Sequence, residues 1–433
     1  MNKTIGKLAL FSIILATSAS AVFSQTSAPR QEKLLNGLKL YIFNNSPEKL
    51  VTVKIRVHNG SAFDPQQKEG VMKLLGEAIF STDTARNYFS EELGGGLSIE
   101  SNYDYIEVTA SSTPDKFLSM LQLLADSITA PDTEKESVAR LKAALLEEIG
   151  SREKDPVHMA DRAIDEALFG DFPYGRAQLG TKRSLANLDW ADLIFAKERL
   201  FSADNASVAI SGGNLNSDII MRAARRYFGA WLKADKKFPS TFKQPDEPNT
   251  DISIISSPIE NTSEFRMAVR GSARSDSDYL ASRVAAVILD KRFKEKEGAK
   301  AFVKEETNFL PGAFVFGVHD WHLGTIKRID GHVALPVSDH VKDIVEPKVT
   351  QAEFDEAKTK FLSSFSTRDP LETWLDVDTY KLKPIKDEAA AANKLSLADV
   401  QAYFDKLKSR PYAKILLFGE EPAQSNSISA PSN

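Results

Sequence analysis

The strongest constraint on the fold of this chain is an internal repeat at a spacing of 207 residues. When residues 188–212 are shifted by 207 positions, seven of the 25 residues are identical. The identical pairs are Leu188 and Leu395, Ala191 and Ala398, Asp192 and Asp399, Leu200 and Leu407, Ser202 and Ser409, Ala206 and Ala413, and Gly212 and Gly419. A helix followed by a strand shares some composition in any case, but a match without gaps at a fixed period indicates a repeated unit. We therefore expect two homologous domains.

A proline-rich segment separates the two halves. Residues 233–251 read KADKKFPSTFKQPDEPNTD and show no periodic apolar pattern, which is typical of a linker. This segment divides the chain into an N-terminal domain at residues 30–232 and a C-terminal domain at residues 252–420, each within the usual size of roughly 100 to 200 residues. Residues 421–433 are polar and nearly uncharged, and we predict a disordered tail there.

The first 24 residues have the pattern of a secretory signal peptide. Lys3 and Lys7 precede an apolar run at residues 8–16, and small residues follow, so that cleavage after Ala21 or after Ser24 fits the pattern. The apolar run is about half the length of a membrane span, and no later segment reaches roughly 20 uninterrupted apolar residues. We expect a soluble exported protein, periplasmic or secreted, without a membrane span.

The composition excludes several classes of function. The chain has 55 lysines and arginines against 60 acids, a net charge of -5, without any basic run, which disfavours nucleic acid as a partner. Cysteine is absent, which excludes disulfides, thiol nucleophiles and thiolate zinc sites. A metal in this chain would need histidine, aspartate or glutamate ligands.

The periodicity of apolar residues predicts an α+β fold. In the first half we expect helices at residues 70–80, 115–129, 136–152 and 157–169, and strands at residues 37–43, 51–57, 105–111 and 206–211. In the second half we expect strands near Ile252, Phe265, Ala313, His332 and Ala413, and helices near Ser277, Thr350 and Leu397. The first two strands flank a turn-like NNSPEK and are predicted to form a hairpin. Because strands occur in adjacent pairs, sandwich-like α+β layers fit better than a doubly wound sheet.

Four motifs, in order, resemble those of one peptidase family. Residues 34–41 read LLNGLKLY, residues 70–80 read GVMKLLGEAIF, and residues 172–181 read FPYGRAQLGT; VAISGG from Val208 is followed by RRYFGAW from Arg225. Over nearly the whole mature chain, these segments resemble the insulinase and pitrilysin family of zinc peptidases, also called inverzincins. The resemblance is to the small two-domain bacterial type, similar to mitochondrial processing peptidase subunits. It implies two α+β domains that form half of a four-domain clam shell.

The metal motif of that family is degenerate in this chain. The family places His-x-x-Glu-His on the first helix, where two histidines bind zinc and the glutamate activates water, and a glutamate from a later helix completes the site. The resemblance puts Lys73 and Glu77 at the histidines, Gly76 at the general base and Glu148 at the last ligand. Lysine is a cation at neutral pH and opposes a bound dication. We therefore expect no zinc cofactor and no catalytic residue at these positions.

We hypothesise that Lys73 replaces the metal electrostatically. Lys73 and Glu77 are four apart on a helix and therefore neighbours, and the family fold would bring Glu148 to face them. One ammonium between two carboxylates would satisfy the site without metal. The alternative is that Lys73 and Glu77 are merely solvated on the surface, where such a pair contributes only about 0.3 to 0.5 kcal/mol.

Other candidate sites are weaker. His319 and His322 in HDWH have a spacing compatible with a metal on a helix, but the preceding residues alternate like a strand, which would point the two rings to opposite faces. The resemblance also implies an arginine and a tyrosine in the second domain, and the matching segment, residues 301–317, has Val303 or Lys304 and Phe314 there instead. The chain thus departs from the family at both halves of its catalytic equipment.

A glycine-rich segment is the one feature that could bind substrate. The family pairs substrate with an exposed sheet edge next to a "GGxxNAxTxxD" motif, and residues 94–104 read GGGLSIESNYD, with Gly94, Gly95 and Gly96 retained and Ser98 at the asparagine. The alternative is an ordinary glycine-rich turn before a strand.

These observations give one main functional hypothesis and two alternatives. The first is a non-catalytic subunit that closes the chamber of a periplasmic peptidase and helps to bind extended peptides. Its partner would be a two-domain chain with an intact zinc motif, or a second copy of this chain. The second is a free-standing pseudoenzyme that binds peptides or envelope proteins. The third is a metallopeptidase that uses Glu77, Glu148 and a histidine from elsewhere.

Overall fold

The computed structural model describes residues 28–44, 46–234, 242–321, 327–329, 332–334, 336–383 and 385–419. The predicted signal peptide at residues 1–24, residues 235–241 of the predicted linker, the predicted tail at residues 421–433 and His322 of the HDWH segment lie outside the described residues.

The first half forms a six-stranded sheet with the strand order β1-β2-β6-β3-β5-β4. Its strands are β1 (Arg30–Lys33), β2 (Lys39–Ile42), β3 (Val51–Val57), β4 (Gly96–Ser101), β5 (Ile106–Ser112) and β6 (Ala206–Gly212). All seven residues of β6 are buried, because helices cover the sheet on both faces at this strand.

The predicted hairpin of the first two strands is wrong. β6 lies between β2 and β3, pairing parallel to β2 and antiparallel to β3. The two strands do run in opposite directions, as a hairpin requires, but the connection at residues 43–50 is long enough to pass over an inserted strand. Alternation within each strand says nothing about which strand lies beside it.

Helices of the first half pack on one face of this sheet and form its main core. They are α1 (Val71–Glu77), α2 (Asp83–Glu91), α3 (Phe117–Thr129), α4 (Lys135–Arg152), α6 (Lys182–Asn187), α7 (Trp190–Leu200) and α8 (Ser217–Phe228). The helices predicted at residues 70–80, 115–129 and 136–152 correspond to α1 with its 3-10 extension (Ala78–Phe80), α3 and α4. In α3 the buried residues include Phe117, Leu121 and Leu124, the spacing of an amphipathic helix.

The second half forms a five-stranded sheet with the strand order β7-β13-β8-β10-β9. Its strands are β7 (Ile252–Ser256), β8 (Ser263–Arg270), β9 (Ala301–Glu306), β10 (Ala313–His319) and β13 (Ala413–Phe418), and β11 (Lys327–Ile329) pairs with β12 (His332–Ala334) outside this sheet. Its helices are α9 (Tyr279–Glu297), α10 (Pro336–Val345), α11 (Gln351–Ser364), α13 (Ile385–Lys394) and α14 (Leu397–Ser409).

The predicted duplication is confirmed by the topology. Strands β2, β6, β3, β5 and β4 of the first sheet correspond in order to β7, β13, β8, β10 and β9 of the second. β5 and β10, β6 and β13, and α7 and α14 each begin 207 residues apart, since 313 − 106, 413 − 206 and 397 − 190 all give 207. The chain is therefore two homologous α+β domains.

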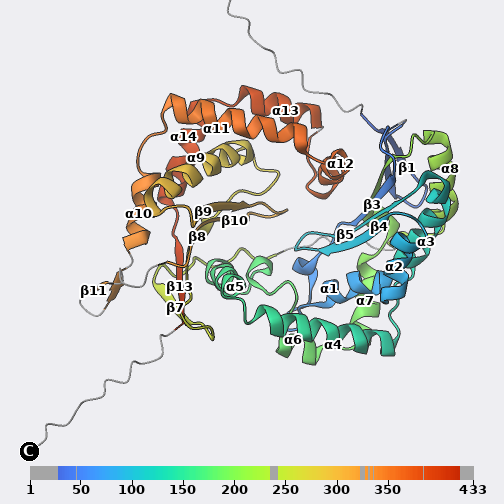
Figure 1. The fold of residues 1–433 in the computed structure, drawn as a ribbon, viewed down its shortest axis with the longest axis horizontal. Coiled ribbons are helices and arrows are strands. Elements are labelled where there is room, and N and C mark those ends of the chain that lie inside the picture. The colour runs from blue at the N-terminus through green and yellow to red at the C-terminus, as the bar shows by residue number, and fades with distance from the viewer. Residues whose placement is uncertain are drawn as a thin grey trace, which may run out of the picture.

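In each domain, one face of the sheet is covered by a helix that belongs to the other domain by sequence, which we call a borrowed helix. α5 (Pro156–Phe169) belongs to the first half by sequence, but it packs on β8 and β13 of the second sheet. α12 (Pro370–Thr379) belongs to the second half, but it packs on β6 and β3 of the first sheet. Figure 1 shows both helices in the middle of the molecule, between the two sheets. This exchange covers the second face of each sheet and interlocks the two domains.

Within the described part of the chain, no helix combines the length and the apolar character that a membrane span requires.

Candidate functional site

Helix α1 stands where the resemblance places the metal-binding helix. The carboxylate of Asp64 accepts hydrogen bonds from the backbone N–H groups of Gly70 (2.7 Å) and Met72 (2.8 Å), so it caps the first turn of α1. Met72 and Leu75 are buried in the core of the first domain. Lys73 and Glu77 are therefore left on the opposite, more open side of the helix.

Lys73 and Glu77 form an ion pair. The Lys73 Nζ atom lies 2.6 Å from Glu77 Oε1, and the side chains are only 17% and 22% exposed. Arg86 of α2 pairs with the second carboxylate oxygen at 2.5 Å. Burial alone would raise the pKa of Glu77, but the hydrogen bond and charge of Lys73, together with Arg86, outweigh burial and lower that pKa. Glu77 is thus held as an anion between two cations.

Among the described residues, no ion pair joins Glu148 to Lys73. Glu148 instead accepts hydrogen bonds from Arg152, one turn further along α4, at 2.8 and 3.1 Å. The hypothesis of Lys73 between two carboxylates is therefore corrected: one carboxylate lies between two cations. Arg86 replaces Glu148 in the cluster because α2 follows α1 closely in the chain and lies against its C-terminal end.

Gly76 leaves no side chain at the position that the resemblance assigns to the general base. A Cβ atom added there would lie 2.7 Å from Ser101 Oγ and 3.4 Å from Ile106 Cγ2. The Ser101 hydroxyl at the end of β4 therefore takes up the space in which a longer side chain would begin. Any acid at position 76 would require Ser101 to rotate away.

These residues do not fit a zinc ion. Lys73 is a cation, and both carboxylate oxygens of Glu77 already form ion pairs. Glu148 pairs with Arg152. In the described ranges, no group of three or more histidine, aspartate or glutamate side chains is arranged to hold a metal. A tetrahedral zinc site needs three or four such ligands, so no catalytic step through zinc can be assigned to this helix.

Replacing Lys73 with alanine is expected to lower the free energy of unfolding by about 1 kcal/mol, the upper end for partly exposed ion pairs. The loss is limited because Arg86 still pairs with Glu77. Urea unfolding at neutral pH measures it. The matched control is Arg152→Ala on the exposed Arg152–Glu148 pair, which should leave stability within error. Equal stability of Lys73→Ala and wild type would instead support the alternative of two solvated side chains.

The glycine-rich segment leads into an edge strand. β4 pairs with β5 and is the last strand in its sheet order, and Ser98 on it is exposed. Gly94 has φ 65°, and a Cβ atom on Gly95 would lie 1.9 Å from the carbonyl oxygen of Ser111. Both glycines are thus required by the turn and by the close approach of β5. An unpaired strand edge can accept an added strand, which is one mode of peptide recognition.

The residues that the resemblance places at the family's arginine and tyrosine make local structural contacts. Phe314 on β10 is fully buried in the core of the second domain, and Lys304 on β9 pairs with Glu306 at 2.5 Å. His319 also has a local partner, since its Nδ1 atom lies 2.8 Å from Glu264 Oε2. Phe314 is thus a core residue, and His319 links β10 to β8.

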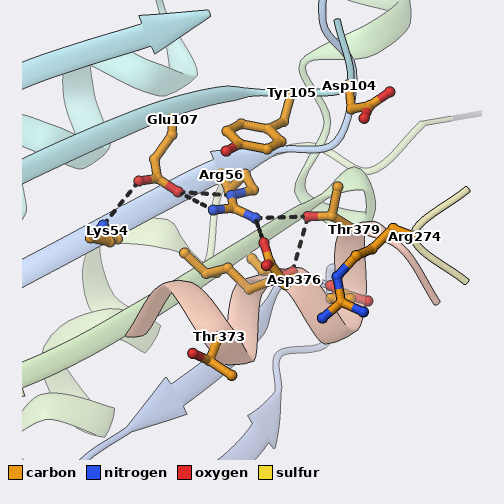
Figure 2. A network of polar contacts seen from close by, with 12 residues as sticks. Lys54, Arg56, Asp104, Tyr105, Glu107, Arg274, Thr373, Asp376 and Thr379 are labelled. Carbon is orange, nitrogen blue, oxygen red and sulfur yellow. Dashed lines mark hydrogen bonds and ion pairs between the residues drawn. The ribbon is translucent and has the colours of Figure 1, made fainter. Parts of the chain in front are cut away.

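A polar network between the domains was missing from the sequence-based expectations. Three residues at a spacing of two, Lys54, Arg56 and His58, lie on β3 or directly after it. Each contacts an aspartate of the borrowed helix α12 or of its N-terminal cap. Figure 2 shows the central part of this network. The pairs are Lys54 with Asp369 (3.0 Å), Arg56 with Asp376 (2.7 Å) and His58 with Asp378 (3.1 Å). A basic face on a strand that is buried on both sides was the signal that an acidic element covers it.

Arg56 is the centre of this network. It is fully buried, its Nε atom donates to Glu107 at 2.7 Å, and its guanidinium lies 3.8 Å from the centre of the Tyr105 ring. Arg266 has the matching position in the second domain, fully buried on β8 and bonded to Asp161 of α5 at 2.6 Å. Each buried arginine thus fixes the helix that comes from the other domain.

Comparison with known proteins identifies the family. Residues 40–182 match the model of the insulinase family, peptidase family M16, and residues 188–299 match the M16 inactive domain. The chain belongs to peptidase family M16. The sequence resemblance to this family is thereby confirmed, and α1 lies within the residues that match the insulinase model.

Some similar proteins are named as zinc proteases and others as non-peptidase homologues. An uncharacterized zinc protease of Rickettsia felis is 23% identical over 47% of this chain, and the aligned region spans about half the length of that protein. A non-peptidase homolog from Helicobacter pylori is 20% identical over 72% of this chain and 74% of its own. The crystal structure of an M16 inactive-domain protein from Pseudomonas fluorescens superposes with a TM-score of 0.78 at 20% identity, over 91% of this chain and 98% of that one. This likeness confirms the two-domain M16 fold.

Proposed function

We propose that this chain is a non-catalytic M16 subunit that closes the chamber of a periplasmic peptidase. The observation that carries the proposal is the cluster at α1: Lys73 and Glu77, which the resemblance places at two zinc ligands, form an ion pair that Arg86 of α2 joins, and Gly76 supplies no general base. The inactive-domain match and the naming of one relative as a non-peptidase homolog support it. The N-terminal pattern of residues 1–24 supports export.

The partner is a second two-domain chain. The resemblance implies a shell of four such domains, and this chain supplies two of them. A partner with an intact His-x-x-Glu-His helix would provide the zinc and the chemistry, while a second copy of this chain would give a closed shell without either. A complex with the first kind of partner would therefore be catalytic, and a complex of two copies of this chain would not.

The edge of β4 supports a role in holding peptides. Its position at the end of the sheet leaves backbone groups for an added strand, and Ser98 is exposed there. An extended peptide bound along Gly96 and Ser98 would lie beside the Ser101 hydroxyl and the α1 cluster. In this proposal the chain binds peptide and the partner cleaves it.

A free-standing pseudoenzyme is the alternative that shares the same site. It differs only in the absence of a catalytic partner. The third hypothesis, a metallopeptidase with unusual ligands, has less support because Glu77 and Glu148 are engaged in separate ion pairs on α1 and α4.

The purified chain is expected to contain less than about one tenth of an equivalent of zinc and to cleave no peptide above background. Metal analysis and a quenched-fluorescence peptide library, with and without added zinc, measure both properties. The control is Glu148→Ala, which should change neither. Zinc-dependent cleavage that is lost in Glu148→Ala would instead establish the metallopeptidase hypothesis.

A further inference from the structure

A cavity of about 520 Å³ lies beside the linker, and no residue of α1 lines it. This volume is within the range of ligand pockets in proteins. Phe169 at the end of α5, Phe172 and Phe242 form an aromatic wall. Prolines of the linker and of the segment before β13, including Pro245 and Pro411, extend the apolar surface.

Two arginines line the same cavity. Arg270 is the last residue of β8, and Arg410 follows α14. Arg270 donates hydrogen bonds to the carbonyl oxygens of Leu168 (3.1 Å), Pro245 (3.3 Å) and Asp246, and Arg410 donates to those of Arg270 and Gly271 (3.1 Å). These acceptors are all backbone carbonyls, which are dipoles and not counter-charges.

This arginine pair differs from the other arginines of the core. Arg56, Arg266, Arg274 and Arg292 each pair with a carboxylate. Among the described residues, Arg270 and Arg410 donate to backbone carbonyls and form no ion pair, although the exposed Glu247 also lines the cavity. Burial lowers the pKa of Arg270; the charge of the exposed Glu247 opposes this shift, the charge of Arg410 adds to it, and the exposed Asp246 also opposes it. Two cations side by side at a cavity favour an anion from outside the chain.

One nitrogen of Arg270 points to the same conclusion. Its Nε atom is buried and has no hydrogen-bond partner in the described part of the protein. Buried donors in proteins are nearly always paired. One nitrogen each of Arg56, Arg162, Arg176 and Arg266 is in the same state, so it is the combination with a cavity and a second arginine that favours a ligand here. A carboxylate in the cavity would give both guanidiniums the counter-charge that backbone carbonyls do not supply.

We propose that this cavity binds the C-terminal residue of a peptide, with the free carboxylate on Arg270 and Arg410 and an apolar or aromatic side chain against the phenylalanine wall. The peptide carboxylate would neutralise the charge of the two arginines, and its apolar side chain would pack against the phenylalanines of the lining. A free inorganic anion would leave the aromatic wall without a ligand.

A neighbouring cavity leaves room for the preceding residues of the peptide. It has a volume of about 320 Å³, shares Phe242 and Leu310 with the first cavity, and continues to Asp104 and Tyr174 of the first domain. The peptide backbone would thus run along the junction of the two domains. This inference deepens the proposed function by naming the peptide end that is recognised, and it rests on that function only for the source of the peptide.

The test is fluorescence anisotropy of the full chain with two labelled peptides that differ only at the last group. One ends in Leu-Phe with a free carboxylate, and the other ends in the Leu-Phe amide. We expect the acid to bind at least tenfold more tightly than the amide, about 1.4 kcal/mol. Arg410→Gln should reduce the affinity for the acid to that for the amide and leave the amide unchanged. Arg222→Gln on the exposed face of α8 is the matched control and should change neither affinity.

Equal affinities for acid and amide, or no binding of either, would overturn the proposal. The comparison on the wild-type chain needs no variant, so the proposal stays testable if Arg410→Gln fails to fold. Binding of N-acetylphenylalanine without binding of the acid peptide would identify a small carboxylic acid as the ligand and also overturn it. The proposed subunit role fails separately, by the absence of a partner, and strand addition at β4 would retain the amide peptide.

Discussion

Replacing Arg56 with alanine is expected to lower the free energy of unfolding by about 3 to 5 kcal/mol, the range for breaking a buried ion pair. Arg56 is fully buried, and its loss leaves Glu107 inside the protein with Lys54 as its remaining cation at 3.2 Å. Asp376 would lose the contact that ties α12 to the first sheet. Packing of the guanidinium on Tyr105 would also be lost.

Urea unfolding followed by far-UV circular dichroism measures this effect. The matched control is Arg30→Ala, because the Arg30 side chain is 38% exposed and its ion pairs with Glu32 and Asp218 lie at the surface. We expect that control to stay within about 0.5 kcal/mol of the wild type. A loss below 1 kcal/mol for Arg56→Ala would mean that the network is solvated and does not fix α12.

Replacing Leu375 with alanine is expected to cost about 2 to 5 kcal/mol, the range for truncating a buried leucine. Leu375 of α12 is fully buried and packs with Tyr41, Phe43 and Ala209 of the first sheet. Because α12 belongs to the second domain by sequence, this cavity weakens the contact between domains. We therefore expect one cooperative transition to split toward two, with different midpoints for fluorescence and circular dichroism.

The control for this prediction is Leu118→Ala on α3. Leu118 is 48% exposed and should change stability by less than about 0.5 kcal/mol. A Leu375→Ala protein that unfolds with the wild-type midpoint would show that the borrowed helix contributes little to holding the domains together.

The sequence predicted the helices and strands of this fold better than it predicted which of them pack side by side. Helices such as α3 and α4 were evident because their apolar spacing records burial on one face. The insertion of β6 between β2 and β3 and the exchange of α5 and α12 were not predictable, because periodicity does not reveal which element covers a face. The domain boundaries at residues 232 and 252 stay predictions.

In the candidate site too, contacts within one helix were predicted and contacts between helices were not. The ion pair of Lys73 and Glu77 follows from their helical spacing of four, and it was predicted. The place of Glu148 depends on how α4 lies against α1, and there the nearer Arg152 is its partner. Arg86 was overlooked because nothing in the sequence marks α2 as a neighbour of Glu77. The basic residues Lys54, Arg56 and His58 did carry a signal, since three polar residues alternate on a strand with buried neighbours.

The most direct test of the central claim is to capture the tagged chain from the periplasm of its native host and to identify by mass spectrometry what remains bound after a moderate salt wash. A non-catalytic subunit predicts a stoichiometric M16 relative with an intact His-x-x-Glu-His helix, and zinc-dependent peptidase activity in that complex alone. Recovery of the chain by itself, or with unrelated envelope proteins only, would contradict the subunit role and favour a free-standing pseudoenzyme.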